Sequence, residues 1–180
     1  MKMFRICGYG GGRGALVSRL VDEFAFRQVG IAVIKYAHKP FDVDREGSDT
    51  YNLRQRGCQQ TLIANRDRWA LMCETPAGQE PSPVLLAAHL SECDLVLAVG
   101  FDGVPLPGLE VMRADDAAEP LYRRDAHIQT VVTDGIPPAD ILFTFTHNCI
   151  EAIATHILEQ AILLPSVGGR RKQPRMPETF

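Results

Sequence analysis

The sequence lacks several features that mark whole classes of protein. No apolar run reaches the roughly 18 residues of a membrane span, so we expect no membrane association. The 19 Lys and Arg are outnumbered by 22 Asp and Glu, and the net charge of −3 offers no broad cationic field to a nucleic acid. The first residues, MKMFRICGYGGG, hold no long apolar segment typical of a secretion signal. We therefore expect a cytoplasmic protein that binds neither nucleic acid nor membrane.

Closely spaced cysteines are also missing. The five cysteines stand at positions 7, 58, 73, 93 and 149, an odd number without the spacing of a zinc or redox motif. We interpret them as small apolar side chains in a reducing compartment. The sequence has no GxSxG motif and no Cys–His signature, so nucleophilic hydrolase chemistry has no support.

The sequence does contain alternating strand and helix patterns. Apolar runs predict strands at residues 2–7, 31–36, 59–65, 68–74, 94–101, 109–113, 128–134 and 141–145. A first helical pattern follows the first strand and ends at Gly30, and a second covers residues 48–56, with Ser48 or Asp49 as cap and Gly57 as terminator. A third covers residues 83–92, with Ser82 as cap. The last contains Ile150, Ile153, Ile157 and Leu158 on one face. This order predicts one α/β domain over residues 1–164, with a mostly parallel sheet and helices on both faces. Residues 165–180 hold three prolines, two glycines and a basic cluster, a composition that predicts a mobile tail.

A glycine-rich loop between the first strand and the first helix is the strongest chemical signal. The loop GYGGGRGA contains five glycines, which are Gly8, Gly10, Gly11, Gly12 and Gly14. Glycine allows positive φ and close approach of a phosphate, and the N-terminus of the following helix favours anions. Residues 8–15 therefore predict a phosphate-binding site, with a merely flexible turn as the alternative.

This loop departs from the Walker A pattern GxxxxGK[ST], whose Lys reaches the β- and γ-phosphates and whose hydroxyl binds Mg²⁺. Aligned from Gly8 with one residue fewer, Arg13 stands at the Lys position and Gly14 at the Ser or Thr position. Arginine still holds a phosphate but is no isostere of an ammonium group, and glycine offers no Mg²⁺ ligand. We therefore expect weak or no GTP hydrolysis.

A dinucleotide-binding pattern competes for the same loop. Gly10, Gly12 and Ala15 satisfy GxGxxA. The acidic residue that would hold a ribose is absent, because the second strand ends on Lys35. An NAD(P) site is the weakest of the hypotheses for this loop.

A longer pattern begins at the second strand. The segment IKYAHKPFDVDREGSDTYNLRQRGCQQTLIANRDRWALMCET resembles the MobB family, adaptors of molybdopterin guanine dinucleotide synthesis. That family shows a strand end of the type IKHxHH, then D-x-D-x-x-G-K-D-S/T-Y, then a strand containing RWALM, and the similarity covers roughly residues 3–160. The matching positions are Ile34, Lys35, His38, Asp42, Asp44, Gly47, Asp49, Tyr51, Gly57, Arg68, Trp69, Ala70, Leu71 and Met72.

The resemblance implies a P-loop NTPase-like three-layer fold that dimerises through additional strands. It also implies binding of GTP and assistance to the guanylyltransferase that attaches GMP to molybdopterin. Residues 8–15, Lys35 and His38 would then contact a guanine nucleotide or the dinucleotide cofactor itself. Three carboxylates would lie near Mg²⁺, a cation that selects oxygen ligands; these are Asp42, Asp44 and Asp49.

The chain departs from the family pattern at its chemical positions. The second histidine after the strand is Lys39, and the lysine of the GKDS segment is Ser48. The strand end VEGFK, whose Glu helps to organise metal and water, reads AVGFD and carries Val99 and Asp102. Together with the altered loop, these changes indicate a retained scaffold with altered chemistry.

Three functions remain open. The first is a divergent adaptor that binds a guanine nucleotide or molybdopterin guanine dinucleotide and contacts the guanylyltransferase, a molybdoenzyme or its chaperone. The second is a slow GTPase in which Arg13 and a relocated acid, Asp94 or Asp102, serve. The third is an interaction module that binds no nucleotide. Of the remaining residues, we expect Trp69 and Met72 in the core or a dimer interface, Arg113, Arg123 and Arg124 in solvent, and His147 and His156 in the last helix or its cap.

Overall fold

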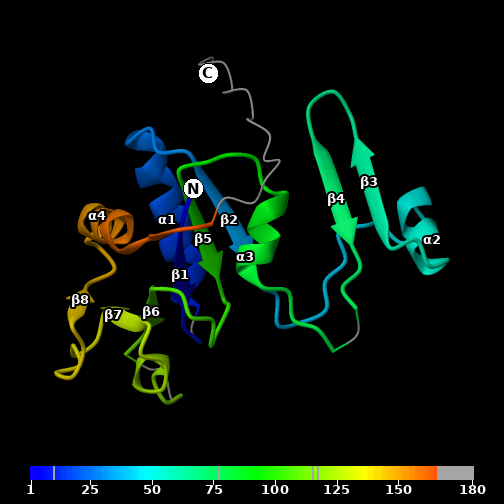
Figure 1. Ribbon diagram of the computed structural model, residues 1–180. Helices are drawn as coiled ribbons and strands as arrows, with labels where there is room; N and C mark the ends of the chain where they lie inside the picture. Colours follow the sequence, from blue (N-terminus) through cyan, green and yellow to red (C-terminus); the bar gives the residue numbers. More distant parts are fainter. Residues whose placement is uncertain (10, 77, 115, 117, 166–180) are drawn as a thin grey trace. The chain divides into compact units, whose positions relative to one another are not determined.

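The computed structural model describes residues 1–9, 11–76, 78–114, 116 and 118–165 (Figure 1). The chain forms two compact units, which we call the sheet unit (Met1–Tyr36 with Ser82–Phe180) and the hairpin unit (Ala37–Pro81). Apart from residue 165, the predicted tail lies outside the described residues. The single domain expected over residues 1–164 stays a prediction. Within these ranges no helix is both long and apolar enough to cross a membrane.

The sheet unit is built on one mostly parallel sheet. Its strands follow the order β2-β5-β1-β6-β7-β8, all paired in parallel, and β9 pairs antiparallel with the start of β1. The bounds are Lys2–Cys7 for β1, Ile31–Lys35 for β2, Leu95–Val99 for β5, Gly108–Met112 for β6, Ile128–Thr133 for β7, Phe143–Phe145 for β8 and Ile162–Leu163 for β9. The predicted α/β class is confirmed. The short β9 was not predicted.

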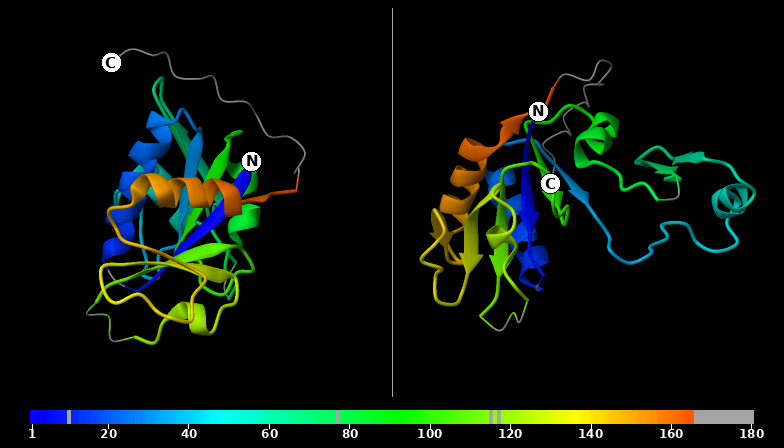
Figure 2. Two further views of the ribbon diagram at one scale, coloured as in Figure 1. Left: turned by 90° about the vertical axis from the view of Figure 1, so that its left-hand side faces the viewer. Right: turned by 60° about the horizontal axis from the view of Figure 1, so that its bottom comes forward.

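Helices cover both faces of this sheet, as expected. The helices α1 (Gly12–Phe26) and α4 (Ile150–Gln160) pack on one face, where they bury Leu16, Leu20, Phe24, Ile153 and Ile157 (Figure 2). The other face carries α3 (Pro83–Leu86), the 3-10 turns η1 (Ala87–His89) and η2 (Leu121–Arg123), and their apolar neighbours. Because side chains alternate along a strand, β1 serves both faces, and Phe4 and Ile6 point to α1 and α4.

Three details of the sequence prediction need correction. The left-handed residue after α1 is Gln28, with φ 58°, whereas Gly30 lies beside Asp94, whose carboxylate accepts a hydrogen bond from the Gly30 N–H at 2.8 Å. The helix that starts at Pro83 ends at Leu86, well before residue 92, because the chain turns back to begin β5. Strand β2 is the outermost strand on one side of the sheet and pairs with β5 alone, so Ile34 is its one buried residue.

The hairpin unit contains α2 (Asp49–Gln55) and the antiparallel pair β3 (Gln60–Ala64) and β4 (Trp69–Cys73). Ser48 caps α2, because its hydroxyl accepts a hydrogen bond from the Tyr51 N–H at 3.2 Å. Gly57 follows the helix with φ 94°. The predicted helix, its caps and both strands are therefore confirmed.

Candidate functional site

The glycine loop leaves the C-terminal end of β1 through a backbone conformation that only glycine accepts. Gly8 has φ 128°, and a Cβ built there would lie 2.3 Å from the carbonyl oxygen of Val111 in β6. The Val111 carbonyl belongs to the backbone of β6, so it cannot move away from such a contact as the end of a flexible side chain can. The structure therefore requires glycine at this position, which supports the prediction of a specialised loop over that of a merely flexible turn.

The other glycines of the loop differ in what they allow. Gly12 opens α1, and a Cβ there would lie 3.4 Å from both His147 Nε2 and Val111 Cγ1. A Cβ at Gly11 or Gly14 would meet no atom within 4 Å. Gly10 lies outside the described residues. The excess of glycine in the loop is thus not explained by packing alone.

The length of the loop corrects our alignment with the Walker A pattern. Gly8 to Ala15 spans the eight positions of GxxxxGK[ST], so no residue is missing. Without a gap, Arg13 occupies the position of the second glycine of the pattern, Gly14 that of the lysine and Ala15 that of the serine or threonine. Both alignments leave the loop without the lysine and without the Mg²⁺-binding hydroxyl.

The guanidinium of Arg13 lies at the C-terminal ends of β1 and β5. Its Nη1 donates a hydrogen bond to the Gly8 carbonyl oxygen at 2.8 Å. A Cβ on Gly100, which has φ 82° just after β5, would lie 3.5 Å from the same nitrogen. Arg13 therefore places a positive charge at the edge of the sheet where the glycine loop begins.

The sequence did not predict that His147 and Arg124 lie next to the loop. His147 precedes α4 and lies beside Gly12, and its carbonyl oxygen accepts a hydrogen bond from Arg19 Nη1 at 2.6 Å. Arg124 is exposed, as expected, but it also donates a hydrogen bond to the Tyr9 hydroxyl and stands 5.9 Å from the centre of that ring. The end of β8 at residue 145 did offer a signal for His147, because parallel strands end at a common edge.

The other charged candidates of the sheet unit fall at different places. Lys35 ends β2 and is exposed, in register with Val99 at the end of β5, so it stands at the same edge of the sheet as the loop. Asp94 precedes β5 and lies at the opposite edge, where Gly30 binds it. It therefore cannot replace the missing acid at the loop, and this part of the slow-GTPase hypothesis is wrong. Asp102 follows β5 and is exposed.

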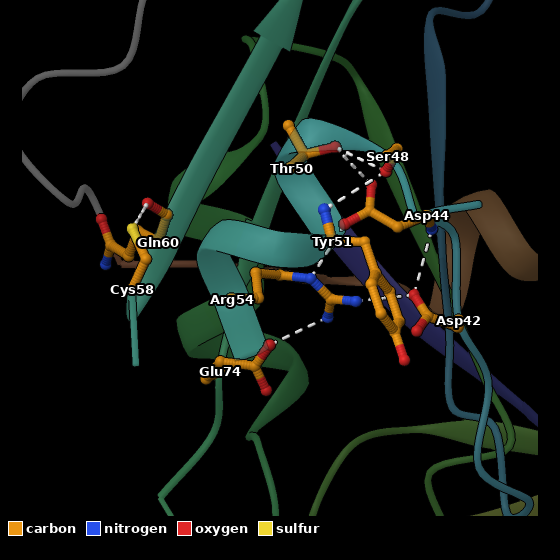
Figure 3. Close-up of polar contacts among 9 residues, drawn as sticks. All are labelled: Asp42, Asp44, Ser48, Thr50, Tyr51, Arg54, Cys58, Gln60 and Glu74. Atoms are coloured by element: carbon orange, nitrogen blue, oxygen red, sulfur yellow. Dashed lines mark hydrogen bonds and ion pairs between the residues drawn. The ribbon is translucent and has the colours of Figure 1, made fainter. Parts of the chain in front are cut away.

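The predicted metal ligands belong to the hairpin unit, where two of them bind an arginine (Figure 3). Arg54 in α2 contacts Asp44 at 2.9 Å, Asp42 at 2.8 Å and Glu74 at 2.9 Å. Burial acts to lower the pKa of Arg54, but its hydrogen bonds with Asp44 and Glu74 and the charge of Asp42 raise it overall. Thr50 adds a hydrogen bond to Asp44 at 3.0 Å.

This arrangement leaves little of a magnesium site. The guanidinium of Arg54 already neutralises Asp42 and Asp44, while Asp49 is the first residue of α2 and takes no part in these contacts. His38 is exposed in the same unit. Across the part of the chain that the structure describes, no three His, Cys, Asp or Glu side chains are grouped to hold a metal ion. The residues as they stand do not fit Mg²⁺, and the metal site stays a prediction.

Comparison with known protein sequences finds relatives over most of the chain. A protein named molybdopterin-guanine dinucleotide biosynthesis adapter protein from Haemophilus influenzae is 32% identical over 130 residues, covering 72% of this chain and 72% of its own. The Escherichia coli protein of the same name is 32% identical over 154 residues, covering 83% of this chain and 87% of its own.

Solved structures share the fold. The crystal structure of molybdopterin-guanine biosynthesis protein B superposes with a TM-score of 0.68 at 21% identity, over 87% of this chain and 98% of that one. MobB of Bacillus subtilis gives a TM-score of 0.67 at 12% identity, over 89% of this chain and 98% of its own. The family model of MobB, molybdopterin guanine dinucleotide synthesis protein B, matches residues 3–134. The chain belongs to the MobB family.

Proposed function

We propose that this protein is an adaptor in the synthesis or insertion of molybdopterin guanine dinucleotide. In this role it binds a guanine nucleotide, or the nucleotide part of the finished cofactor, at the glycine loop and hydrolyses GTP weakly or not at all. Its partner is the guanylyltransferase, a molybdoenzyme or its chaperone, and it works in the cytoplasm. The names of the relatives from Haemophilus influenzae and Escherichia coli support the general role.

The observation that carries the nucleotide part is the pairing of Gly8 with Arg13. A Cβ at Gly8 would lie 2.3 Å from Val111 O, so the backbone keeps the shape that lets a phosphate approach. Arg13 sits on the Gly8 carbonyl at 2.8 Å, and a guanidinium is a strong, bidentate phosphate ligand. The N-terminus of the 15-residue helix α1 adds unpaired N–H groups at the same place.

Weak hydrolysis follows from what the loop does not contain. Phosphoryl transfer depends on positioning and on neutralising charge, which lysine, Mg²⁺ and its hydroxyl ligand supply in competent P-loop enzymes. Gly14 and Ala15 carry neither an ammonium nor a hydroxyl group. Slow, Mg²⁺-dependent hydrolysis of GTP that is lost in Asp102→Asn would instead establish the slow-GTPase alternative with Asp102 as its acid.

Calorimetric titration with GTP, with and without Mg²⁺, tests nucleotide binding, and ATP and GDP serve as comparisons. We expect selective binding of the guanine nucleotides at micromolar concentrations, weakened at least about tenfold in Arg13→Ala by loss of a charge-assisted contact. Arg66→Ala is a matched control, because Arg66 is exposed in the turn between β3 and β4. Absence of heat with every nucleotide would contradict the proposal and leave an interaction module.

A homodimer formed through the hairpin unit is a further part of the proposal. Both strands of the hairpin expose apolar side chains, and Trp69 is 55% exposed. The exposed Leu62 and Leu71 lie on the same face of the pair as Trp69, whereas the exposed Ile63 lies on the opposite face. Apolar surface such as that of Leu62, Trp69 and Leu71 is typical of protein–protein contacts.

Sedimentation equilibrium tests this dimer. We expect Trp69→Lys to shift the protein toward monomer, because a charge would be buried without a partner in the interface. Phe26→Lys is the control, since Phe26 is an exposed aromatic residue at the end of α1 in the sheet unit. A wild-type protein that stays monomeric at high concentration would rule out this part of the proposal.

A further inference from the structure

The Arg13 guanidinium lies against the backbone where β1 and β5 end. Its Nη1 donates a hydrogen bond at 2.8 Å to the carbonyl oxygen of Gly8, the residue after β1. On the side of β5, a Cβ on Gly100 would lie 3.5 Å from this nitrogen and 3.7 Å from the guanidinium carbon. The Arg13 side chain is half-buried, and a guanidinium carries several N–H donors, more than this one contact uses. A positive charge with donors for an anion is therefore built into the start of the loop.

Two further cationic side chains stand at the same edge of the sheet. Lys35 ends β2, is exposed and lies in register with Val99, the last residue of β5. Arg113 directly follows β6, and its Cγ would lie 4.0 Å from a Cβ on Gly12, the first residue of α1. Because β2, β5, β1 and β6 are neighbours in this order, these two cations and Arg13 border the carboxyl ends of four adjacent strands.

The loop carries no hydroxyl group at the position where a P-loop binds Mg²⁺. Gly14 and Ala15 occupy that position in the two possible alignments with the Walker A pattern. The next hydroxyl along the chain, that of Ser18, donates to the Gly14 carbonyl oxygen at 3.1 Å within α1 itself. A metal ion bound to a phosphate here would therefore lack its usual protein ligand and would lie close to a guanidinium.

The carboxylates of Asp102 and Asp116, which follow β5 and β6, already have hydrogen-bond donors. Burial raises the pKa of the Cys7 thiol to about 12, and the protonated thiol forms a hydrogen bond with Asp102. Asp116 accepts a hydrogen bond from the Arg113 N–H at 2.9 Å. In the hairpin unit, three carboxylates surround the guanidinium of Arg54. The residues at the loop therefore suit an anion better than a metal ion.

We propose that the glycine loop binds its nucleotide in the metal-free form, with Arg13 supplying the positive charge that Mg²⁺ supplies in competent P-loop enzymes. The guanidinium donates to phosphate oxygens in a bidentate manner, and Lys35 and Arg113 add positive charge beside it. This mode of binding rests on the proposed function, since it concerns the same loop. It goes beyond that function by specifying that the phosphates bind without a metal ion.

Mg²⁺ should therefore oppose the binding of GTP, the reverse of its effect in a competent P-loop. The metal ion cancels part of the negative charge of the triphosphate, and beside Arg13 it would repel the guanidinium. Binding equilibria are linked reciprocally. If Mg²⁺ weakens the binding of GTP to the protein, the protein must weaken the binding of the metal ion to GTP by the same factor.

Calorimetric titration of the whole protein with GTP, in EDTA and in excess Mg²⁺ at equal ionic strength, measures the first effect. We expect GTP to bind about threefold or more tightly in EDTA. This difference should largely disappear in Arg13→Gln and should narrow in Lys35→Gln, which removes a charge farther from the Gly8 carbonyl. Arg66→Gln is the matched control, because it removes an exposed charge in the turn between β3 and β4 and should keep the difference.

Electron paramagnetic resonance of Mn²⁺, which substitutes for Mg²⁺, measures the second effect. Free Mn²⁺ gives a sharp spectrum that is lost in the complex with GTP. Addition of the protein in excess to Mn·GTP should therefore restore the spectrum of the free ion, whereas Arg13→Gln should restore less of it. This measurement depends on binding alone and needs no hydrolysis.

The outcomes separate this mode of binding from nucleotide binding as such. Tighter binding of Mg·GTP, equal binding in both media with Mn²⁺ retained on GTP, or a preference for free GTP unchanged in Arg13→Gln and Lys35→Gln would overturn the proposal and leave nucleotide binding intact. Absence of heat in both media would contradict the proposed function, and metal-free binding with it. Unfolding midpoints show whether each variant is folded.

Discussion

The sheet unit and the hairpin unit keep their shape by different means. In the sheet unit, three clusters of buried apolar side chains line both faces of the sheet. In the hairpin unit, α2 has no buried residue, and Thr61 is the one residue among 37–76 and 78–81 that is buried as a whole. Its order comes from backbone pairing of β3 with β4 and from the carboxylates around Arg54.

This difference assigns different tasks to the two units. A buried core fixes backbone to within the tolerance that close packing allows, so the sheet unit can hold a demanding turn such as that at Gly8. Polar contacts exposed to water contribute little net stability, and elements held by them open easily. The hairpin unit is thus suited to transient contacts, such as those with a partner chain. Substitutions that act on one unit and leave the other unchanged test this contrast.

The largest expected effect comes from Arg5 in the sheet unit. Arg5→Met removes the guanidinium that lies 2.6 Å from the Asp125 carboxylate and leaves this largely buried carboxylate without a counter-charge. The free energy of unfolding should fall by about 3–5 kcal/mol. Denaturant unfolding followed by circular dichroism measures this change. Arg27→Met is the control, because the ion pair of Arg27 with Glu23 at 2.6 Å is partly exposed and should contribute less than about 1 kcal/mol. Equal losses in the two variants would contradict the special role of the buried pair.

A smaller effect is expected inside the glycine loop. Gly8→Ala forces a Cβ against the Val111 carbonyl oxygen at a φ of 128°, and backbone strain of this kind costs about 1–3 kcal/mol. Gly11→Ala meets nothing within 4 Å and should be nearly neutral. Thermal unfolding compares the two variants, and calorimetry should show loss of nucleotide binding in Gly8→Ala alone. Equal stability of the pair would mean that the turn is not fixed by its surroundings.

A local effect is expected in the hairpin unit. Arg54→Gln removes the cation that Asp42, Asp44 and Glu74 share and leaves their charges to repel each other. Hydrogen exchange of the amides in α2, β3 and β4 should accelerate about tenfold or more, while the amides of β1 and β5 stay protected. Arg56→Gln, at the C-cap directly after Gln55, controls for loss of charge. Slower or unchanged exchange in the hairpin unit would rule out Arg54 as its organising residue.

The same variant tests the magnesium site that the sequence predicted. If Asp42 and Asp44 can bind a cation once Arg54 is gone, Mg²⁺ should restore protection in Arg54→Gln and have no effect on the wild-type protein. Carboxylates select such hard cations when no guanidinium neutralises them. Failure of Mg²⁺ to protect the variant would mean that the spacing of Asp42 and Asp44 suits arginine alone.

Local pattern predicted most of the fold, and the exceptions have physical causes. The strand ending at Lys35 and the caps at Ser48 and Gly57 follow from residue types that act on their own neighbours. The left-handed Gln28 does not follow from residue type, because glycine is the usual choice and Gly30 stood nearby. The exposure of β2 depends on strand order, which no local pattern contains.

The candidate site was predictable in part. The loop at residues 8–15 and the loss of its lysine are visible in the sequence. Pairing of Asp42 and Asp44 with Arg54 joins residues 10–12 positions apart and depends on how the chain returns on itself. Contacts such as that of Arg5 with Asp125 join residues 120 positions apart, and only the strand order brings them together.

The smallest effect is expected from the one buried histidine among the described residues of the sheet unit. His156 in α4 lies among the rings of Phe143 and Phe145, 4.7 and 5.4 Å away, and its Nε2 is 2.7 Å from Thr130 Oγ1. Burial lowers the pKa of His156 below its ordinary value of 6.5, and Glu159 opposes the shift.

Because the His156 imidazole binds a proton more tightly in the unfolded chain than in the native protein, it makes the free energy of unfolding depend on pH. Its contribution is complete above pH 6.5 and is lost as the pH falls below that value toward the lowered native pKa. The free energy of unfolding measured between about pH 7.5 and pH 5 should therefore fall less steeply in His156→Gln than in the wild type. His89→Gln, at an exposed site in η1, should keep the wild-type slope. Because His156 belongs to the sheet unit, hydrogen exchange in α2 should not follow this transition. A parallel change there would mean that the two units unfold as one.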